Sequence, residues 1–130
     1  MEEADVFLFT SSFHEGWGAV LNEAMNSACA VVASHAIGSV PFLIQDNVNG
    51  IIYHYSDFRD LYKKMVILIN QPELREQLGK MAYKSLHETW NARTAAERLI
   101  HLSKSLFNGM DTPYVDGPCS RAIPLKNNWY

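Results

Sequence analysis

Two short apolar runs constrain the fold of this chain more than any other feature. Val6–Thr10 and Ala30–Ser34 are almost continuously apolar, which is the pattern of parallel strands buried on both faces. Between them, Ala19–Ala28 carries apolar and small side chains at helical spacing, so the chain reads as strand, helix, strand. A third strand, Ile51–His54, follows the turn signal of Asp46–Gly50. These elements predict an α/β fold with about three parallel strands, a partial Rossmann-like three-layer α/β/α sandwich.

The remaining segments predict helices and a tail. Residues 37–44 read as a loop that leads into a short helix. Asp57 can cap the helix that follows it, and Pro72 suits the first position of the next one. Asn91 is expected to begin a last helix. Over residues 108–130, glycines and prolines interrupt a tail that has no periodicity, so we expect it to be irregular.

Composition excludes several classes of protein. At 130 residues the chain has the length of one domain, and its 48% apolar and 19% charged residues are ordinary for a globular protein. A net charge of -3 without a basic run gives no electrostatic footprint for nucleic acid. No stretch of about 18 apolar residues is present, so we expect no membrane-spanning helix. Cys29 and Cys119 are too few for a disulfide scaffold, which predicts a cytoplasmic location.

The first strand starts close to the beginning of the chain. It begins at the sixth residue, and only three strands can be counted, whereas doubly wound sheets usually contain more. An apolar strand with an open edge invites pairing with another chain. We therefore expect the sequence to represent the second half of a larger α/β domain, with an edge through which the isolated chain could self-associate.

The stretch from Glu15 to Glu23 has the features of a ligand site. Two carboxylates lie eight residues apart, with Gly16 and Gly18 between them. A helix that opens near Trp17 or Gly18 leaves backbone N–H groups unpaired at a positively polarised tip, and phosphate oxygens are natural partners for them. Glycines let a ligand approach the backbone.

The two carboxylates have separate expected roles. Glu23, more than a turn inside the predicted helix, can accept hydrogen bonds from vicinal hydroxyls such as those of a ribose. Glu15, at the carboxyl end of the first strand, can accept from sugar hydroxyls or stabilise positive charge that develops at an anomeric carbon. On the residues alone an alternative stays open, in which Glu15 only caps the helix and Glu23 is an exposed helix residue.

Other chemistry has weaker support in the sequence. The five histidines show no ligand spacing for a metal, and there is no Cys-x-x-Cys. Ser11 and Ser12 lack a surrounding Gly-x-Ser-x-Gly elbow, which disfavours nucleophilic catalysis. The ring of Trp17 could either stack on a sugar or base or pack within the protein.

The residues Thr10–Gly18 and Glu23–Met25 closely resemble the nucleotide-sugar-binding motif of family 4 retaining glycosyltransferases of the GT-B fold. In that family two glutamates lie eight residues apart around the same glycines. The similarity continues through the second strand and the Gly38–Pro41 loop to about Leu106. The resemblance implies that Glu15 is a catalytic residue facing the transferred sugar and that Glu23 binds the ribose. It also implies that the backbone around the turn meets the sugar and diphosphate, through Gly16, Trp17, Gly18, Ala19 and Val20.

The same resemblance defines domains and partners. Residues 1–107 correspond to the C-terminal part of a nucleotide-sugar-binding domain, and the substrate is a nucleoside diphosphate sugar. A saccharide or lipid-linked acceptor would be held by an N-terminal domain that this chain lacks, in polysaccharide biosynthesis in the cytoplasm or peripherally at the inner membrane face. No metal cofactor is expected. Because no Arg or Lys lies between Met1 and Phe58, the cationic partners of the diphosphate are missing, so we expect the chain alone to be inactive.

Three positions depart from the family pattern. Ser39 stands where the family usually has a second glycine, and Phe42 stands where it often has a glutamate. Ala28–Ala30 replaces a Gly-x-Pro segment.

Two alternative functions stay open for a chain with this predicted fold. One is a sugar-nucleotide 2-epimerase, and the other is a non-catalytic α/β interaction module.

Overall fold

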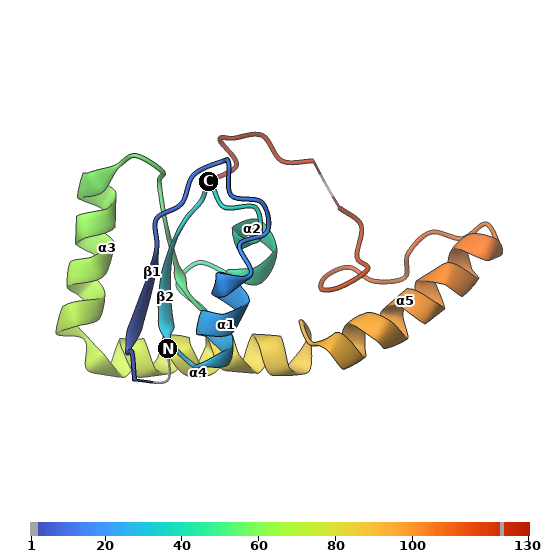
Figure 1. Cartoon of the computed structure of the whole chain (residues 1–130), viewed down its shortest axis with the longest axis horizontal. Coiled ribbons are helices and arrows are strands. Elements are labelled where there is room, and N and C mark those ends of the chain that lie inside the picture. The colour runs from blue at the N-terminus through green and yellow to red at the C-terminus, as the bar shows by residue number, and fades with distance from the viewer. Residues whose placement is uncertain (1–2, 123) are drawn as a thin grey trace.

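A computed structural model of the chain describes residues 3–122 and 124–130. Three strands form one sheet: β1 (Val6–Phe9), β2 (Ala30–Ser34) and β3 (Ile51–Tyr53). All neighbours are parallel, in the order β1-β2-β3, with Val6 opposite Ala30 and Val32 opposite Ile51. The prediction of an α/β fold with three parallel strands is therefore confirmed (Figure 1).

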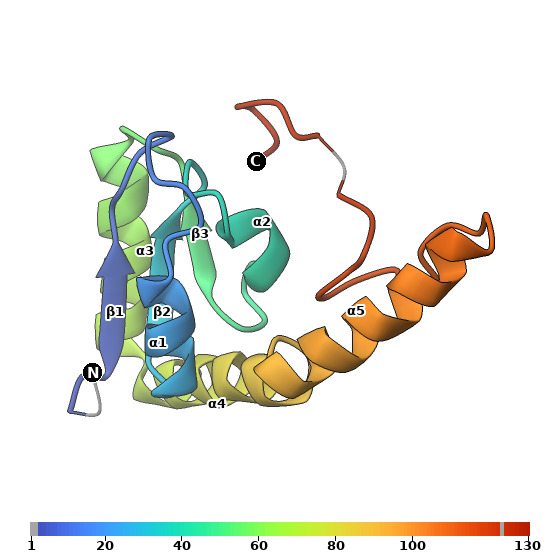
Figure 2. The same cartoon turned by 45° about the vertical axis from the view of Figure 1, so that its right-hand side comes forward.

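The described residues also form five helices. They are α1 (Val20–Asn26), α2 (Val40–Leu43), α3 (Phe58–Asn70), α4 (Pro72–Glu88) and α5 (Ala92–Phe107). In Figures 1 and 2, α1 and α2 lie on one side of the sheet, α3 lies on the other, and α4 crosses below the amino ends of the strands. This arrangement is the expected three-layer sandwich, with α5 extending away from it.

Local signals set the ends of the long helices as predicted. The Asp57 carboxylate accepts hydrogen bonds from the backbone N–H groups of Arg59 and Asp60, both at 2.9 Å, and so caps α3. Pro72 is the first residue of α4. At the start of α5, the Asn91 side chain accepts from the backbone N–H of Thr94 at 2.8 Å.

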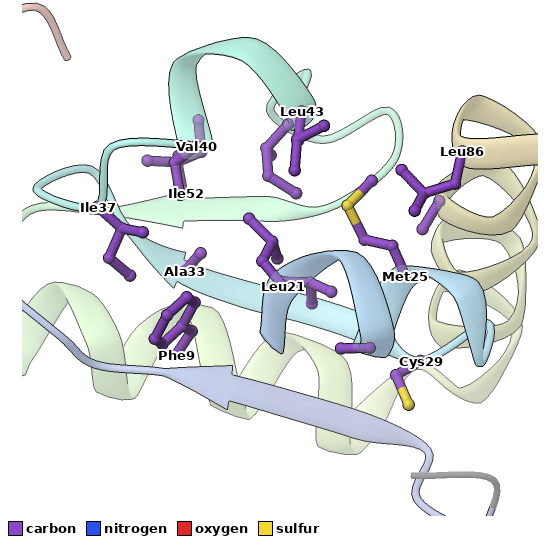
Figure 3. Packing of buried hydrophobic residues seen from close by; sticks show 14 residues of the cluster. Phe9, Leu21, Met25, Cys29, Ala33, Ile37, Val40, Leu43, Ile52 and Leu86 are labelled. Carbon is purple, nitrogen blue, oxygen red and sulfur yellow. The ribbon is translucent and has the colours of Figure 1, made fainter. Parts of the chain in front are cut away.

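The two faces of the sheet bury separate cores. On the first face, side chains of the strands pack against α1 and α2, as Figure 3 shows for Leu21, Met25, Val40 and Leu43 above Ala33. On the second face, alternate strand residues pack against α3 and α4, and this cluster comprises Ala30, Val32, Ile51, Tyr53, Leu68 and Leu78. The middle strand β2 is buried along its whole length, as its apolar run predicted.

The prediction that the first strand is buried on both faces is wrong. Only Phe9 of β1 is buried, Val6 and Phe7 are half-buried, and Leu8 is 41% exposed. The reason is topological, since β1 is an edge strand with β2 on one side only. Its apolar side chains therefore face a partly open surface.

The C-terminal tail leaves the sheet and returns to it. Ser105 is the only buried residue of α5 in the described structure, because this helix extends away from the sandwich. After α5 the tail runs back to the carboxyl ends of the strands, where the C-terminus lies (Figures 1 and 2). Within the described residues, no helix is both long and apolar enough to cross a membrane.

Candidate functional site

The loop between β1 and α1 carries the predicted site at the carboxyl end of the sheet. A turn closes it, in which the backbone N–H of Glu15 donates to Ser12 O at 2.9 Å. The Ser11 hydroxyl donates to Glu15 Oε2 at 3.1 Å. The Glu15 carboxylate is thus half-buried and held by a neighbour on the same loop, and it does not cap α1, whose N-cap position makes no side-chain hydrogen bond.

Helix α1 occupies most of the predicted Ala19–Ala28 segment. It starts at Val20 and not near Trp17 or Gly18, and it is only seven residues long. Gly18 has φ +69°, a left-handed conformation that cannot continue into a right-handed helix. As a consequence Glu23 lies in the first turn of α1 and not more than a turn inside the helix as predicted, and its side chain is exposed.

The loop presents a row of available backbone donors. Of the hydrogen bonds formed among described residues, none uses the N–H groups of Trp17, Gly18, Ala19 or Val20. Gly18 is required here for two reasons, because its φ is positive and because a Cβ atom would lie 2.8 Å from the Phe9 ring. Four adjacent donors on a tightly packed turn can bind an anion without reorganising the backbone.

A second glycine loop supports the first. The backbone N–H of Gly38 donates to Gly16 O at 3.1 Å, and any Cβ at position 38 would overlap that carbonyl oxygen. Gly16 is the opposite case, since nothing lies within 4 Å of the place where its Cβ would be. Gly38 therefore permits close contact between the loops, whereas Gly16 borders open space that a ligand could occupy.

The ring of Trp17 packs against other aromatic rings, although the residue remains 43% exposed. It stacks on Phe42 with ring centroids 5.9 Å apart and 26° between the planes, and it also contacts Trp90 at 5.9 Å. Its indole N–H donates to Asn22 Oδ1 at 2.9 Å, which ties the loop to the first turn of α1. Phe42, the departure from the family glutamate, thus serves as the partner of Trp17.

The departure at Ser39 leaves a buried hydroxyl. Ser39 is fully buried at the start of α2, and its Oγ has no hydrogen-bond partner among the described residues. An unpaired buried hydroxyl is destabilising, so this serine is less well accommodated than the glycine that the family usually has at this position.

The sequence analysis missed His35 and the residues that contact it. His35 follows β2 directly, and its Nδ1 accepts from the backbone N–H of Tyr55 at 2.9 Å. Its Nε2 therefore carries the proton and donates to Asn127 O at 3.0 Å. The Trp129 indole N–H donates in turn to His35 O at 3.1 Å. The feature of the sequence that could have indicated these contacts is the adjacent aromatic pair Trp129 and Tyr130 at the end of the tail.

A cavity of about 190 Å³ opens between the glycine loops and the tail. Its walls include Phe13 and Gly38 from the loops and Lys126 and Trp129 from the tail. Within residues 3–122 and 124–130, no group of three or more His, Cys, Asp or Glu side chains could hold a metal ion. The loop therefore offers the carboxylates of Glu15 and Glu23 and the backbone donors of Trp17–Val20, and the neighbouring cavity offers Lys126.

Comparison with known proteins agrees with this architecture. The model of the family "Glycosyl transferases group 1" matches residues 1–85. Sulfoquinovosyl transferase SQD2 of Arabidopsis thaliana is 35% identical over 107 residues, which is 79% of this chain and 21% of that protein. The chain thus spans about a fifth of the length of this curated relative.

Solved structures lead to the same family. The C-terminal domain of the glycosyl transferase group 1 protein LpcC from Francisella tularensis is similar with a TM-score of 0.57 and 31% identity, over 64% of this chain and 42% of that one. Anabaena Alr3699/HepE, solved in complex with UDP, has a TM-score of 0.72 at 22% identity, over 80% of this chain and 28% of that one, which shows the shared fold. The chain therefore belongs to the group 1 glycosyl transferases and has the Rossmann-like architecture of the GT-B fold.

Proposed function

We propose that this chain is the donor-binding portion of a family 4 retaining glycosyltransferase, which moves a hexose-type sugar from a nucleoside diphosphate to a saccharide or lipid-linked acceptor. One observation carries the proposal. Glu15, the four available backbone N–H groups and Glu23 follow one another along a single loop and helix turn at the carboxyl edge of the sheet. The relative SQD2 is named a transferase, and HepE was solved with UDP, which supports a nucleotide-sugar donor.

The loop backbone binds the diphosphate in this proposal. The N–H groups of Trp17–Val20 donate to phosphate oxygens, and the open space beside Gly16 admits the ligand. The carboxylate of Glu23, exposed in the first turn of α1, accepts hydrogen bonds from the ribose hydroxyls. These contacts orient the donor, and they are independent of the identity of its base.

Glu15 acts at the sugar. Its carboxylate is held by the Ser11 hydroxyl, so its position is fixed before the donor arrives. As the bond from the sugar to the diphosphate breaks, positive charge develops at the anomeric carbon, and a fixed carboxylate stabilises that charge. Glu15 is thereby the catalytic residue of this portion of the enzyme.

The chain carries only part of the machinery in this proposal. It spans 21% of SQD2, and we expect the acceptor to be bound by residues outside it. We therefore expect the chain to bind the donor without turning it over, with no metal cofactor. The cytoplasmic location, peripheral contact with the inner membrane face and a role in polysaccharide synthesis remain predictions.

Titration with UDP, GDP and ADP tests the proposal. Glu23→Gln should weaken binding of the preferred nucleotide about tenfold, because hydrogen bonds to charged groups contribute about 1.5–3 kcal/mol. Glu73→Gln is the matched control, since Glu73 is likewise exposed in the first turn of a helix, α4, and should leave the affinity unchanged.

The titration also separates this proposal from its alternatives. Glu15→Gln should leave nucleotide affinity near that of the unmodified chain, while it abolishes transfer when introduced into the whole enzyme. Absence of binding for all three nucleotides would refute the proposal and favour a non-catalytic interaction module. Epimerisation of the donor sugar without transfer would favour the epimerase.

A further inference from the structure

The last seven residues form a strap across the carboxyl ends of β2 and β3. This C-terminal strap, residues 124–130, lies outside the 1–85 segment that the family model matches. Its C-terminal half makes two separate attachments. The indole of Trp129 donates to His35 O at 3.1 Å, and His35 Nε2 donates back to Asn127 O at 3.0 Å. A reciprocal pair of hydrogen bonds thus fixes the strap beside β2.

The terminal tyrosine provides the second attachment. The Tyr130 hydroxyl lies 2.9 Å from Ile52 O and 3.1 Å from Asp46 Oδ2. Its ring also contacts His54 and His35, with centroids 4.9 Å and 6.2 Å away. The strap is therefore bound beside β2 and to β3 through Asn127, Trp129 and Tyr130, which places the neighbouring Lys126 at the same edge of the sheet.

The strap supplies a cation where the loops have none. The cavity of about 190 Å³ has Lys126 and Asn127 on its strap side and Phe13 and Gly38 on its loop side. The residues with available N–H groups, Trp17–Val20, do not line this cavity, but they are its neighbours, because Gly38 in its wall is hydrogen-bonded to Gly16 and Phe42 in its wall stacks on Trp17. Lys126 itself is exposed. No Arg or Lys occurs between Met1 and Phe58 in the sequence. Lys126 forms no ion pair within the described part of the chain.

We infer that Lys126 is a donor-binding residue, whose ammonium group pairs with a phosphate of the nucleoside diphosphate in the cavity between the strap and the glycine loops. The inference rests on the proposed function and adds the cationic group that the loops lack. A lysine binds phosphate as a compact point charge, and such charge-assisted bonds are about twice as strong as neutral ones. The cavity is smaller than the roughly 300–1,000 Å³ of a complete small-molecule site, so it can hold only part of the donor.

Binding of UDP and uridine to the 130-residue chain tests this inference. Lys126→Gln should weaken UDP binding about five- to tenfold and leave uridine binding unchanged, because only UDP carries the charge that Lys126 meets. Lys126→Arg should restore most of the UDP affinity. Lys104→Gln removes an exposed lysine from the last turn of α5 and should bind UDP as the unmodified chain does.

Salt dependence gives a second readout that a purely structural effect would not change. The UDP affinity of the unmodified chain should fall more steeply with ionic strength than that of Lys126→Gln. Equal UDP affinity of Lys126→Gln and the unmodified chain would overturn the inference while leaving the proposed function intact, and so would an equal loss of UDP and uridine binding. Absence of UDP, GDP and ADP binding in the unmodified chain would overturn both.

Discussion

Replacement of Gly38 by alanine tests whether close contact between the two glycine loops builds the site. The added methyl group overlaps Gly16 O, which accepts the Gly38 N–H at 3.1 Å, so the loops must separate. Overpacking of this kind costs about 1–3 kcal/mol, and the lost hydrogen bond adds about 1 kcal/mol. For a domain of this size about 1 kcal/mol lowers Tm by roughly 3–5 °C, so a fall of about 6–20 °C is expected.

The structure offers matched controls for this substitution. Gly16→Ala places its methyl group in open space, with no atom within 4 Å, so Tm should not fall and could rise by up to about 5 °C. That methyl group nevertheless occupies the approach to the loop and should weaken UDP binding. Gly79→Ala overlaps Ala28 O, at the opposite end of the sheet, and should lower Tm without changing the UDP affinity of the folded protein.

Thermal unfolding followed by circular dichroism, together with UDP titration at low temperature, measures these effects. Gly38→Ala should lose both stability and affinity, Gly16→Ala only affinity, and Gly79→Ala only stability. A Tm for Gly38→Ala equal to that of the unmodified chain would refute the reasoning. So would equal destabilisation by Gly16→Ala and Gly38→Ala.

Three further substitutions test separate features. Ser39→Ala should raise the free energy of unfolding by up to about 1 kcal/mol in chemical denaturation, because it removes a buried hydroxyl that has no partner among the described residues. A clear loss of stability would contradict this, because it would mean that the Ser39 hydroxyl makes a hydrogen bond in the folded protein. Burial and the nearby Asp46 raise the pKa of Tyr130 to about 12, above the unperturbed value of about 10, so its stabilising contribution is complete below pH 10 and is lost as pH rises toward 12. Tyr130→Phe should remove one late-ionising tyrosine from an absorbance titration at alkaline pH, and an unchanged titration curve would contradict the assigned contacts. We propose that the open edge of β1 lets isolated chains associate. Leu8→Lys, which places a charge on this exposed strand, should then reduce the dimer fraction measured by light scattering. Equal dimer fractions for the variant and the unmodified chain would contradict association through β1.

Features that depend on neighbouring residues were predictable from the sequence. The Asp57 and Asn91 caps each act on backbone groups within three residues; the cap at Asp57 and the start of a helix at Asn91 were predicted correctly. The full burial of β2 followed from its apolar run. Burial of β1 was mispredicted because the sequence of a strand does not tell whether it lies at the edge of its sheet.

Features that depend on distant contacts could not be predicted. The start of α1 at Val20 depends on Gly18, whose left-handed conformation fits against Phe9 and Ile37. Trp129 meets His35 across 94 residues of chain, and no periodic pattern marks the strap. The glutamates and glycines of the loop were identifiable because their chemistry and spacing are local. The neighbouring cavity could not be predicted, because part of its wall comes from the tail and the sequence does not tell where the tail lies.

Assigned amide NMR spectra of the chain during nucleotide titration test the central claim most directly. The account predicts that UDP, or GDP or ADP if the base preference differs, produces the largest shifts at the amide signals of Gly16–Val20 and Glu23, and that Lys126 shifts along the same saturation curve. Changes confined to other parts of the molecule, or saturating nucleotide with no change in Trp17–Val20, would contradict the assignment of this loop as the donor site.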